Sequence, residues 1–163
     1  MKIVGLITEY NPFHNGHLYH IEKARELTDA DAVIVVMSGN YVQRGAPAIM
    51  PKHLRAEVAL EAGVDLLMEL PVCYAVGSAE YFAAGAISLF EQLGCVDAIC
   101  FGSECGDYNV LENIAHIVSE EPEEYKFSLQ EALRKGMSFP RARQMALANY
   151  LKEKESDVVY GGY

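Results

Sequence analysis

Apolar and polar residues along the chain follow two alternating periods. Short, almost fully apolar runs predict four buried strands, as in a parallel sheet covered on both faces. They span residues 2–7, 32–37, 65–70 and 97–101. Apolar residues recurring every three or four positions predict helices between these runs. These span residues 17–27, 52–62 and 78–93, and Gly63 and Gly94 are typical stops for the last two.

The last third of the chain has a helical pattern throughout. Predicted helices span residues 108–119, 125–135 and 139–151. Strands that alternate with helices predict an α/β fold, a doubly wound parallel sheet. We therefore expect a core over residues 1–105 and a helical extension over residues 106–163.

Three polar, glycine-containing stretches leave the predicted strands at their carboxyl ends. They read TEYNPFHNGH (8–17), SGNYVQRG (38–45) and GSECGD (102–107). Ligands of open α/β sheets bind at that edge. The coincidence predicts a binding site built from these stretches.

The first of these stretches has the chemistry of a phosphate site. Gly16 removes a side chain where a helix begins, so that a ligand can approach the backbone closely. The free N–H groups of a helix start attract anions, and His14 and His17 flank that point. Histidine donors also stabilise charge that develops on phosphate in a transition state.

Composition narrows the class of protein further. The 163 residues carry a formal net charge of −10, which argues against a nucleic-acid surface spread over the whole chain. No apolar run approaches the ~20 residues that span a bilayer, and the start does not read as a signal peptide. We expect a cytoplasmic protein that does not bind membranes. The four cysteines are expected to be reduced and structural, Cys95 and Cys100 in apolar surroundings, and no metal site is predicted.

HNGH is neither a GxGxxG fingerprint nor a P-loop. It resembles the HxGH signature of the nucleotidylyltransferase superfamily, which has a HIGH-type, Rossmann-like fold. The wider match is to the tRNA(Met) cytidine acetate ligase family, which the chain resembles in four ordered motifs. These are GLITEYNPFHNGHLYHI, VMSGNYVQRGAPAI, GVDLLMELP and FGSE.

The resemblance implies an ATP-dependent ligase that activates acetate as acetyl-adenylate. The acetyl group then passes to N4 of the wobble cytidine of elongator tRNA(Met). His14 and His17 would stabilise the phosphates, and Mg²⁺ would be held mainly by phosphates and water. The implied ATP contacts are Ile7, Thr8, Glu9, Tyr10, Asn11, Pro12, Phe13, His14, Asn15, Gly16, His17, Leu18, Tyr19, His20 and Gly102. From the residues alone, His20 instead reads as a supporting or surface residue.

Other candidates follow the second and third strands. In the superfamily the loop after the second strand tends to face the second substrate, and its candidates here are Ser38, Gly39, Gln43 and Arg44. Arg44 suits a phosphate or the acetate carboxylate through its planar fork. Lys52 is a weaker candidate for the triphosphate. Glu69 is expected to be buried and therefore to need a partner. Two alternatives stay open: an ion pair with Arg55, or a position facing the site.

Members of the resembled family are considerably longer and carry further motifs downstream. We therefore expect this chain to be a shortened or partial member, with its main tRNA contacts elsewhere. Two alternatives stay open. A generic nucleotidylyltransferase would join ATP or CTP to a small phosphorylated substrate, and a non-catalytic module would bind nucleotide without releasing pyrophosphate.

Overall fold

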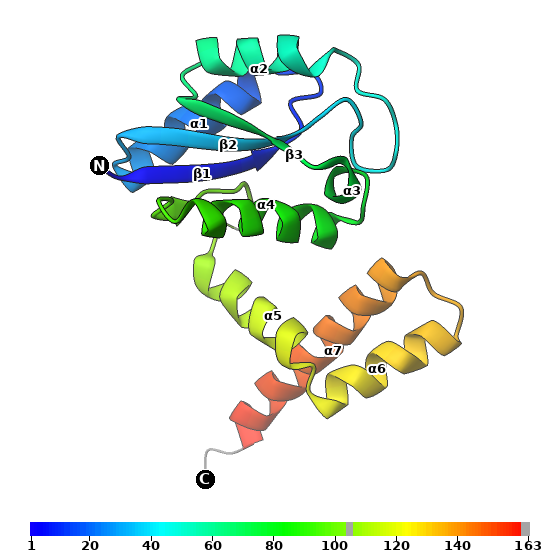
Figure 1. Ribbon diagram of the computed structural model, residues 1–163. Helices are drawn as coiled ribbons and strands as arrows, with labels where there is room; N and C mark the ends of the chain where they lie inside the picture. Colours follow the sequence, from blue (N-terminus) through cyan, green and yellow to red (C-terminus); the bar gives the residue numbers. More distant parts are fainter. Residues whose placement is uncertain (104–105, 161–163) are drawn as a thin grey trace. The chain divides into compact units, whose positions relative to one another are not determined.

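The computed structural model describes residues 1–103 and 106–160. The chain forms two compact units, Met1–Gly102 and Ser103–Tyr163, each described here by itself (Figure 1). Glu104 and Cys105, the last residue of the FGSE motif and its neighbour, lie outside the described residues.

Four parallel strands form the sheet of the first unit. They are β1 (Ile3–Thr8), β2 (Ala32–Ser38), β3 (Leu66–Leu70) and β4 (Ala98–Ile99), in the order β3-β2-β1-β4. The chain builds outward from β1 through β2 to β3 and then returns to the other side of β1 for β4. The carboxyl end of β1 therefore lies where the strand order reverses, the place at which such sheets bind ligands.

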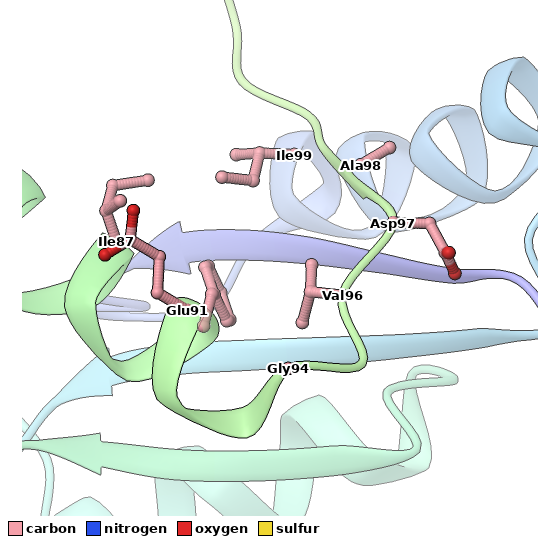
Figure 2. A pocket seen from close by; sticks show the side chains of 8 residues that line it. Ile87, Glu91, Gly94, Val96, Asp97, Ala98 and Ile99 are labelled. Atoms are coloured by element: carbon pink, nitrogen blue, oxygen red, sulfur yellow. The ribbon is translucent and has the colours of Figure 1, made fainter.

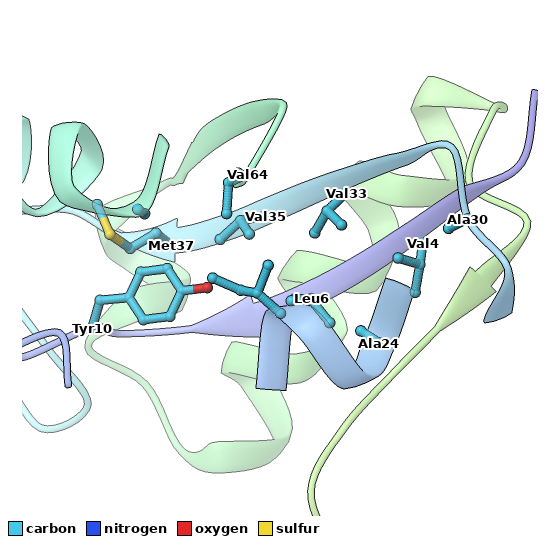
Figure 3. Close-up of a cluster of buried hydrophobic side chains, with 11 residues drawn as sticks. Val4, Leu6, Tyr10, Ala24, Ala30, Val33, Val35, Met37 and Val64 are labelled. Carbon is cyan, nitrogen blue, oxygen red and sulfur yellow. The ribbon is translucent and has the colours of Figure 1, made fainter. Parts of the chain in front are cut away.

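Helices cover both faces of this sheet, as the sequence predicts. Helices α1 (Asn15–Thr28) and α2 (Lys52–Glu61) lie on one face, and α3 (Val72–Ala75) and α4 (Ala79–Leu93) lie on the other (Figure 1). The fully apolar β2 supplies Val33, Val35 and Met37 to the first core and Ile34 and Val36 to the second. Tyr10, Leu6 and Ala24 complete much of the first core (Figure 3). The alternating orientation of side chains along a strand explains this division.

Gly5 sets the distance between β1 and α4. A Cβ at this position would lie 2.9 Å from two ring carbons of Phe90 and 3.1 Å from Val96. Phe90 is buried in the second core. The missing side chain therefore lets an aromatic ring lie directly against the strand.

The second unit is helical. Its elements are α5 (Tyr108–Glu120), α6 (Glu123–Arg134) and α7 (Phe139–Tyr160). A small core joins them, with Ile117 from α5, Tyr125 and Leu129 from α6, and Ala142 and Ala146 from α7. None of the helices among residues 1–103 and 106–160 is both long and apolar enough to cross a membrane.

Some local predictions are wrong. The four-residue helix α3 was not predicted, and β4 covers only Ala98–Ile99 rather than 97–101, although the N–H groups of Asp97 and Cys100 also donate to the β1 carbonyls of Ile3 and Gly5. Helix α1 begins at Asn15, because His14 caps it, and not at His17. Cys95 is exposed rather than set in apolar surroundings, whereas Cys100 is half-buried; both are free thiols.

Candidate functional site

His14 and His17 cap the start of α1 with a reciprocal pair of hydrogen bonds. His14 is the N-cap residue, and its Nδ1 accepts the N–H of Gly16 at 3.1 Å. The Nδ1 of His17 accepts the N–H of His14 at 3.3 Å, which closes a reciprocal capping box. Ser or Thr with Glu or Gln usually fills these two positions. Here imidazoles do so, and the helix start thereby fixes both rings.

This capping fixes where each ring carries its proton. A nitrogen that accepts a hydrogen bond bears a lone pair, so a neutral ring keeps its proton on the other nitrogen. Both histidines therefore have Nε2–H as their free donor. The pKa of His17 is lowered, first by burial and then by the neighbouring His14 and His20, which favours this neutral form. The turn presents two neutral N–H donors close together.

Aromatic side chains pack against the two histidines. The rings of His14 and His17 stack with centroids 3.7 Å apart. Tyr10 and Phe13 pack against His17 with centroids 4.9 and 5.5 Å away. Tyr10 is 1% exposed, and its backbone adopts a positive φ of 46°, uncommon for a residue other than glycine. The strand end thus turns sharply to place Tyr10 under the histidines.

Gly16 lets the His14 ring lie close against the helix start. A Cβ at this residue would lie 2.9 Å from Cε1 of His14. The N–H groups of Gly16 and His17 are also occupied, by His14 Nδ1 and by the His14 carbonyl at 2.8 Å. The expectation of free backbone N–H groups at the helix start is therefore wrong for Gly16 and His17, whose N–H groups the cap occupies. The imidazole Nε2–H groups of His14 and His17 are side-chain donors that this turn offers.

The loop after β2 is tied to the loop after β1. The N–H of Gln43 donates to the Glu9 carboxylate at 2.6 Å, and the N–H of Ile49 donates to Asn11 Oδ1 at 2.7 Å. Ser38 and Gly39 are buried, whereas Arg44 is exposed in the turn of this loop. Among the described residues, the Ser38 hydroxyl has no hydrogen-bond partner. Of the four residues predicted to face a second substrate, Arg44 is thus the one with a solvent-exposed side chain.

Glu69 pairs with Lys52, an alternative that the sequence did not suggest. Their charged atoms lie 2.5 Å apart, and the Glu69 side chain is 48% exposed rather than buried. A Cβ at Gly39 would lie 2.1 Å from Oε1 of Glu69. Gly39 therefore admits the Glu69 carboxylate, which holds Lys52 at the carboxyl edge of β2 and β3.

The sequence singled out Arg55 only as a possible partner of Glu69, and it missed the contacts that this arginine makes instead. Arg55 is 1% exposed, and its guanidinium donates to the carbonyls of Glu9, Ser38, Gly39 and Met50. The available signal was its position four residues before Ala59, on the buried stripe of α2. An arginine on such a stripe requires internal partners.

The remaining predicted ATP contacts differ in their exposure. His20 is half-buried, and burial lowers its pKa although the Cys100 carbonyl acts in the opposite direction. Gly102 is exposed, and a Cβ there would meet nothing within 4 Å. The Asn11–Pro12 peptide bond is cis. Pro12, Asn15 and Tyr19 are exposed, whereas Ile7, Thr8, Asn11 and Leu18 are half-buried.

Two hollows among the described residues lack the chemistry of a phosphate site. One of about 410 Å³ lies beside β4, and its only charged lining residues are Glu91 and Asp97 (Figure 2). The other, of about 520 Å³, lies in the second unit and is lined by Glu123, Glu124 and Glu131. Carboxylates repel phosphate, so the capped turn is the better candidate. Within 1–103 and 106–160, no group of three or more His, Cys, Asp or Glu side chains is arranged to hold a metal ion.

Comparison with known families gives a match over nearly the whole chain. The profile described as HIGH Nucleotidyl Transferase matches residues 1–160. Several curated relatives carry the name tRNA(Met) cytidine acetate ligase. That of Acetivibrio thermocellus is 56% identical over 150 residues, which are 92% of this chain and 36% of the relative. That of Halothermothrix orenii is 51% identical over 156 residues, 96% of this chain and 37% of the relative.

Solved structures show the same similarity. TmcAL of Thermotoga maritima, bound with alpha-thio ATP, matches 95% of this chain with a TM-score of 0.89 and 50% identity. The apo form of that protein gives a TM-score of 0.90 at the same identity. The match covers 38% and 37% of the two solved chains, respectively. The present chain thus spans well under half the length of these relatives.

Proposed function

The chain belongs to the HIGH nucleotidyl transferase family, and from this premise we propose that it contributes the ATP site of an adenylate-forming ligase. The proposed substrates are ATP, acetate and elongator tRNA(Met), whose wobble cytidine is acetylated at N4 in the cytoplasm. The curated relatives of this name and the solved relative bound with alpha-thio ATP support the proposal. Mg²⁺ would arrive with the nucleotide, held mainly by its phosphates and water.

The observation that carries the proposal is the histidine capping box. His14 and His17 present two Nε2–H donors at the carboxyl end of β1, where the strand order reverses. Imidazole N–H groups can donate hydrogen bonds to phosphate oxygens. Their hydrogen bonds strengthen as negative charge develops in the transition state. A triphosphate above this turn would therefore be stabilised most strongly while it reacts.

The first step of the proposed reaction needs no general base. One carboxylate oxygen of acetate attacks the α-phosphorus of ATP, and the bond to the bridging oxygen of pyrophosphate breaks with that oxygen taking the electron pair. In the second step, N4 of the cytidine attacks the acetyl carbon, AMP leaves, and N4 loses one proton. The protein positions the reactants and stabilises phosphate charge.

ATP–pyrophosphate exchange on the purified chain tests the proposal. Exchange that depends on acetate, and is weaker with propionate, is the expected result. ATP binding without exchange under any carboxylate would mean that this chain binds the nucleotide but does not complete the adenylation site, or that the second substrate is not a carboxylate. Exchange that requires a phosphorylated second substrate instead would indicate a generic nucleotidylyltransferase.

A further inference from the structure

The guanidinium of Arg55 joins the segments that build the candidate site. Its Nη1 donates to the Glu9 carbonyl, just after β1. Its Nη2 donates to the carbonyls of Ser38, at 3.2 Å, and Gly39, at the end of β2. Its Nε donates to Met50 at 3.2 Å, just before α2. One buried side chain therefore holds three separate pieces of backbone at the carboxyl edge of the sheet.

The backbone that Arg55 holds at Glu9 is connected to the two histidines by a short segment of chain. The Glu9 and Asn11 side chains accept the N–H groups of Gln43 and Ile49, so the two loops are fixed to each other as well as to Arg55. Tyr10 follows Glu9 and forms the floor under His17. Any shift of the Glu9 carbonyl would therefore reach the capping box within a few residues.

The chemistry of the cluster requires arginine. Four carbonyls surround one planar group whose N–H bonds point in fixed directions. A lysine would retain the charge, but its single ammonium group offers three donors from one point and cannot span this set. Among the described residues, no carboxylate forms an ion pair with this buried guanidinium. Burial lowers the Arg55 pKa, and the more distant charges of Glu9 and Glu69 oppose that change.

We infer that Arg55 is a positioning residue for the phosphate site, which holds the loops after β1 and β2 in the arrangement that aims His14 and His17. This inference rests on the proposed ATP site. It assigns to Arg55 no direct contact with the nucleotide. Its effect on ATP passes through the Glu9–Phe13 segment.

Arg25 provides a matched control. Its guanidinium also donates to backbone carbonyls, those of Ala30, Asp31 and Gly63, and it pairs with Asp65 at 2.7 Å. These residues precede β2 and β3, so Arg25 acts at the amino edge of the same sheet. An Arg25→Lys variant therefore loses comparable contacts away from the candidate site.

The test compares Arg55→Lys and Arg25→Lys in the whole chain, at a temperature where circular dichroism shows both to be folded. ATP affinity comes from calorimetry, and the tautomers of His14 and His17 come from ring ¹⁵N chemical shifts without ATP. We expect both variants to lose stability. Only Arg55→Lys should weaken ATP binding, by about tenfold or more, and change the His17 ring shifts.

Each outcome has a distinct meaning. A folded Arg55→Lys variant with wild-type ATP affinity and unchanged ring shifts would overturn the inference. Equal losses of ATP affinity in both variants would also overturn it, since they would reflect general destabilisation. If wild-type chain binds no ATP, the proposed function fails, whereas the ring shifts still decide whether Arg55 positions the histidines. Should Arg55→Lys not fold, Arg55→Gln takes its place in the same comparison.

Discussion

At the scale of single residues, the chemistry of the site follows from one hydrogen-bond pattern. Each Nδ1 of His14 and His17 accepts a backbone N–H, so each ring has its proton on Nε2. The same contacts would be lost if either Nδ1 were protonated. Capping therefore requires Nδ1 of each ring to stay unprotonated, and it leaves Nε2–H of each ring as the donor for phosphate.

The stability of the chain should consequently depend on pH. The pKa values of His17 and His20 are both lowered, in each case first by burial. The pKa of a histidine in an unfolded chain is about 6.5. Just below that pH, the unfolded chain therefore binds more protons than the folded chain. The free energy of unfolding is thus highest above about pH 6.5 and falls as the pH decreases through the lowered pKa values of the folded chain. Urea denaturation between pH 8 and pH 5 measures this fall.

His17→Gln serves as the companion variant for that experiment. It removes one of the two titrating groups while retaining an acceptor at the same helix position, so its stability should fall less steeply with decreasing pH. An unchanged pH dependence would show that His17 is not held in its neutral form.

Tyr10 provides a second prediction at this scale. Its hydroxyl is buried, and among the described residues it has no hydrogen-bond partner; burial also raises its pKa. Tyr10→Phe should therefore leave the chain as stable or raise the free energy of unfolding by about 1 kcal/mol, because a desolvated hydroxyl is removed. Thermal denaturation measures the change. A clear loss of stability would mean that the hydroxyl is satisfied in solution.

At the scale of elements, two glycines are predicted to behave in opposite ways. Gly5 lies against the buried Phe90 ring, so Gly5→Ala should overpack the second core and cost about 1–3 kcal/mol of unfolding free energy.

Gly102 follows β4 and has open space around it, so Gly102→Ala should leave stability unchanged. If the nucleotide lies against Gly102, that variant should nevertheless bind ATP about tenfold more weakly. Calorimetry and denaturation separate the two effects, and wild-type ATP affinity in a stable Gly102→Ala chain would remove this residue from the proposed site.

The periodicity of apolar residues predicted most helices and strands, because each of the longer ones buries its apolar side chains in a core. The helix α3 escaped prediction because four residues are too few to show a 3.6-residue period. The two histidines could be singled out from their spacing, but their mutual capping is a matter of ring orientation. Arg55 could not be assigned its four carbonyls, because those lie 5 to 46 positions away along the chain.

At the scale of the whole molecule, charge and length bear on the RNA partner. The chain has a formal net charge of −10, and it spans 36–38% of the length of the relatives described above. RNA binding depends on clustered positive charge. The contacts to tRNA that we propose therefore need not come from these residues.

The 163-residue chain alone should accordingly retain little tRNA at about 150 mM salt. Gel-shift titration with tRNA(Met) measures this, with the chain in large excess. Saturable binding that weakens steeply with added salt would contradict the expectation and would place a phosphate-binding surface within these residues.

The central claim is that ATP phosphates bind the Nε2–H donors of the His14–His17 capping box. Titrating ATP into the ¹⁵N-histidine-labelled chain, with ring nitrogens observed by NMR, tests it most directly. The account predicts saturable shifts of the His14 and His17 Nε2 signals, while His53 and His116, which lie on α2 and α5, stay unchanged. Saturable ATP binding that leaves both Nε2 signals unmoved, or no ATP binding at all, would contradict it.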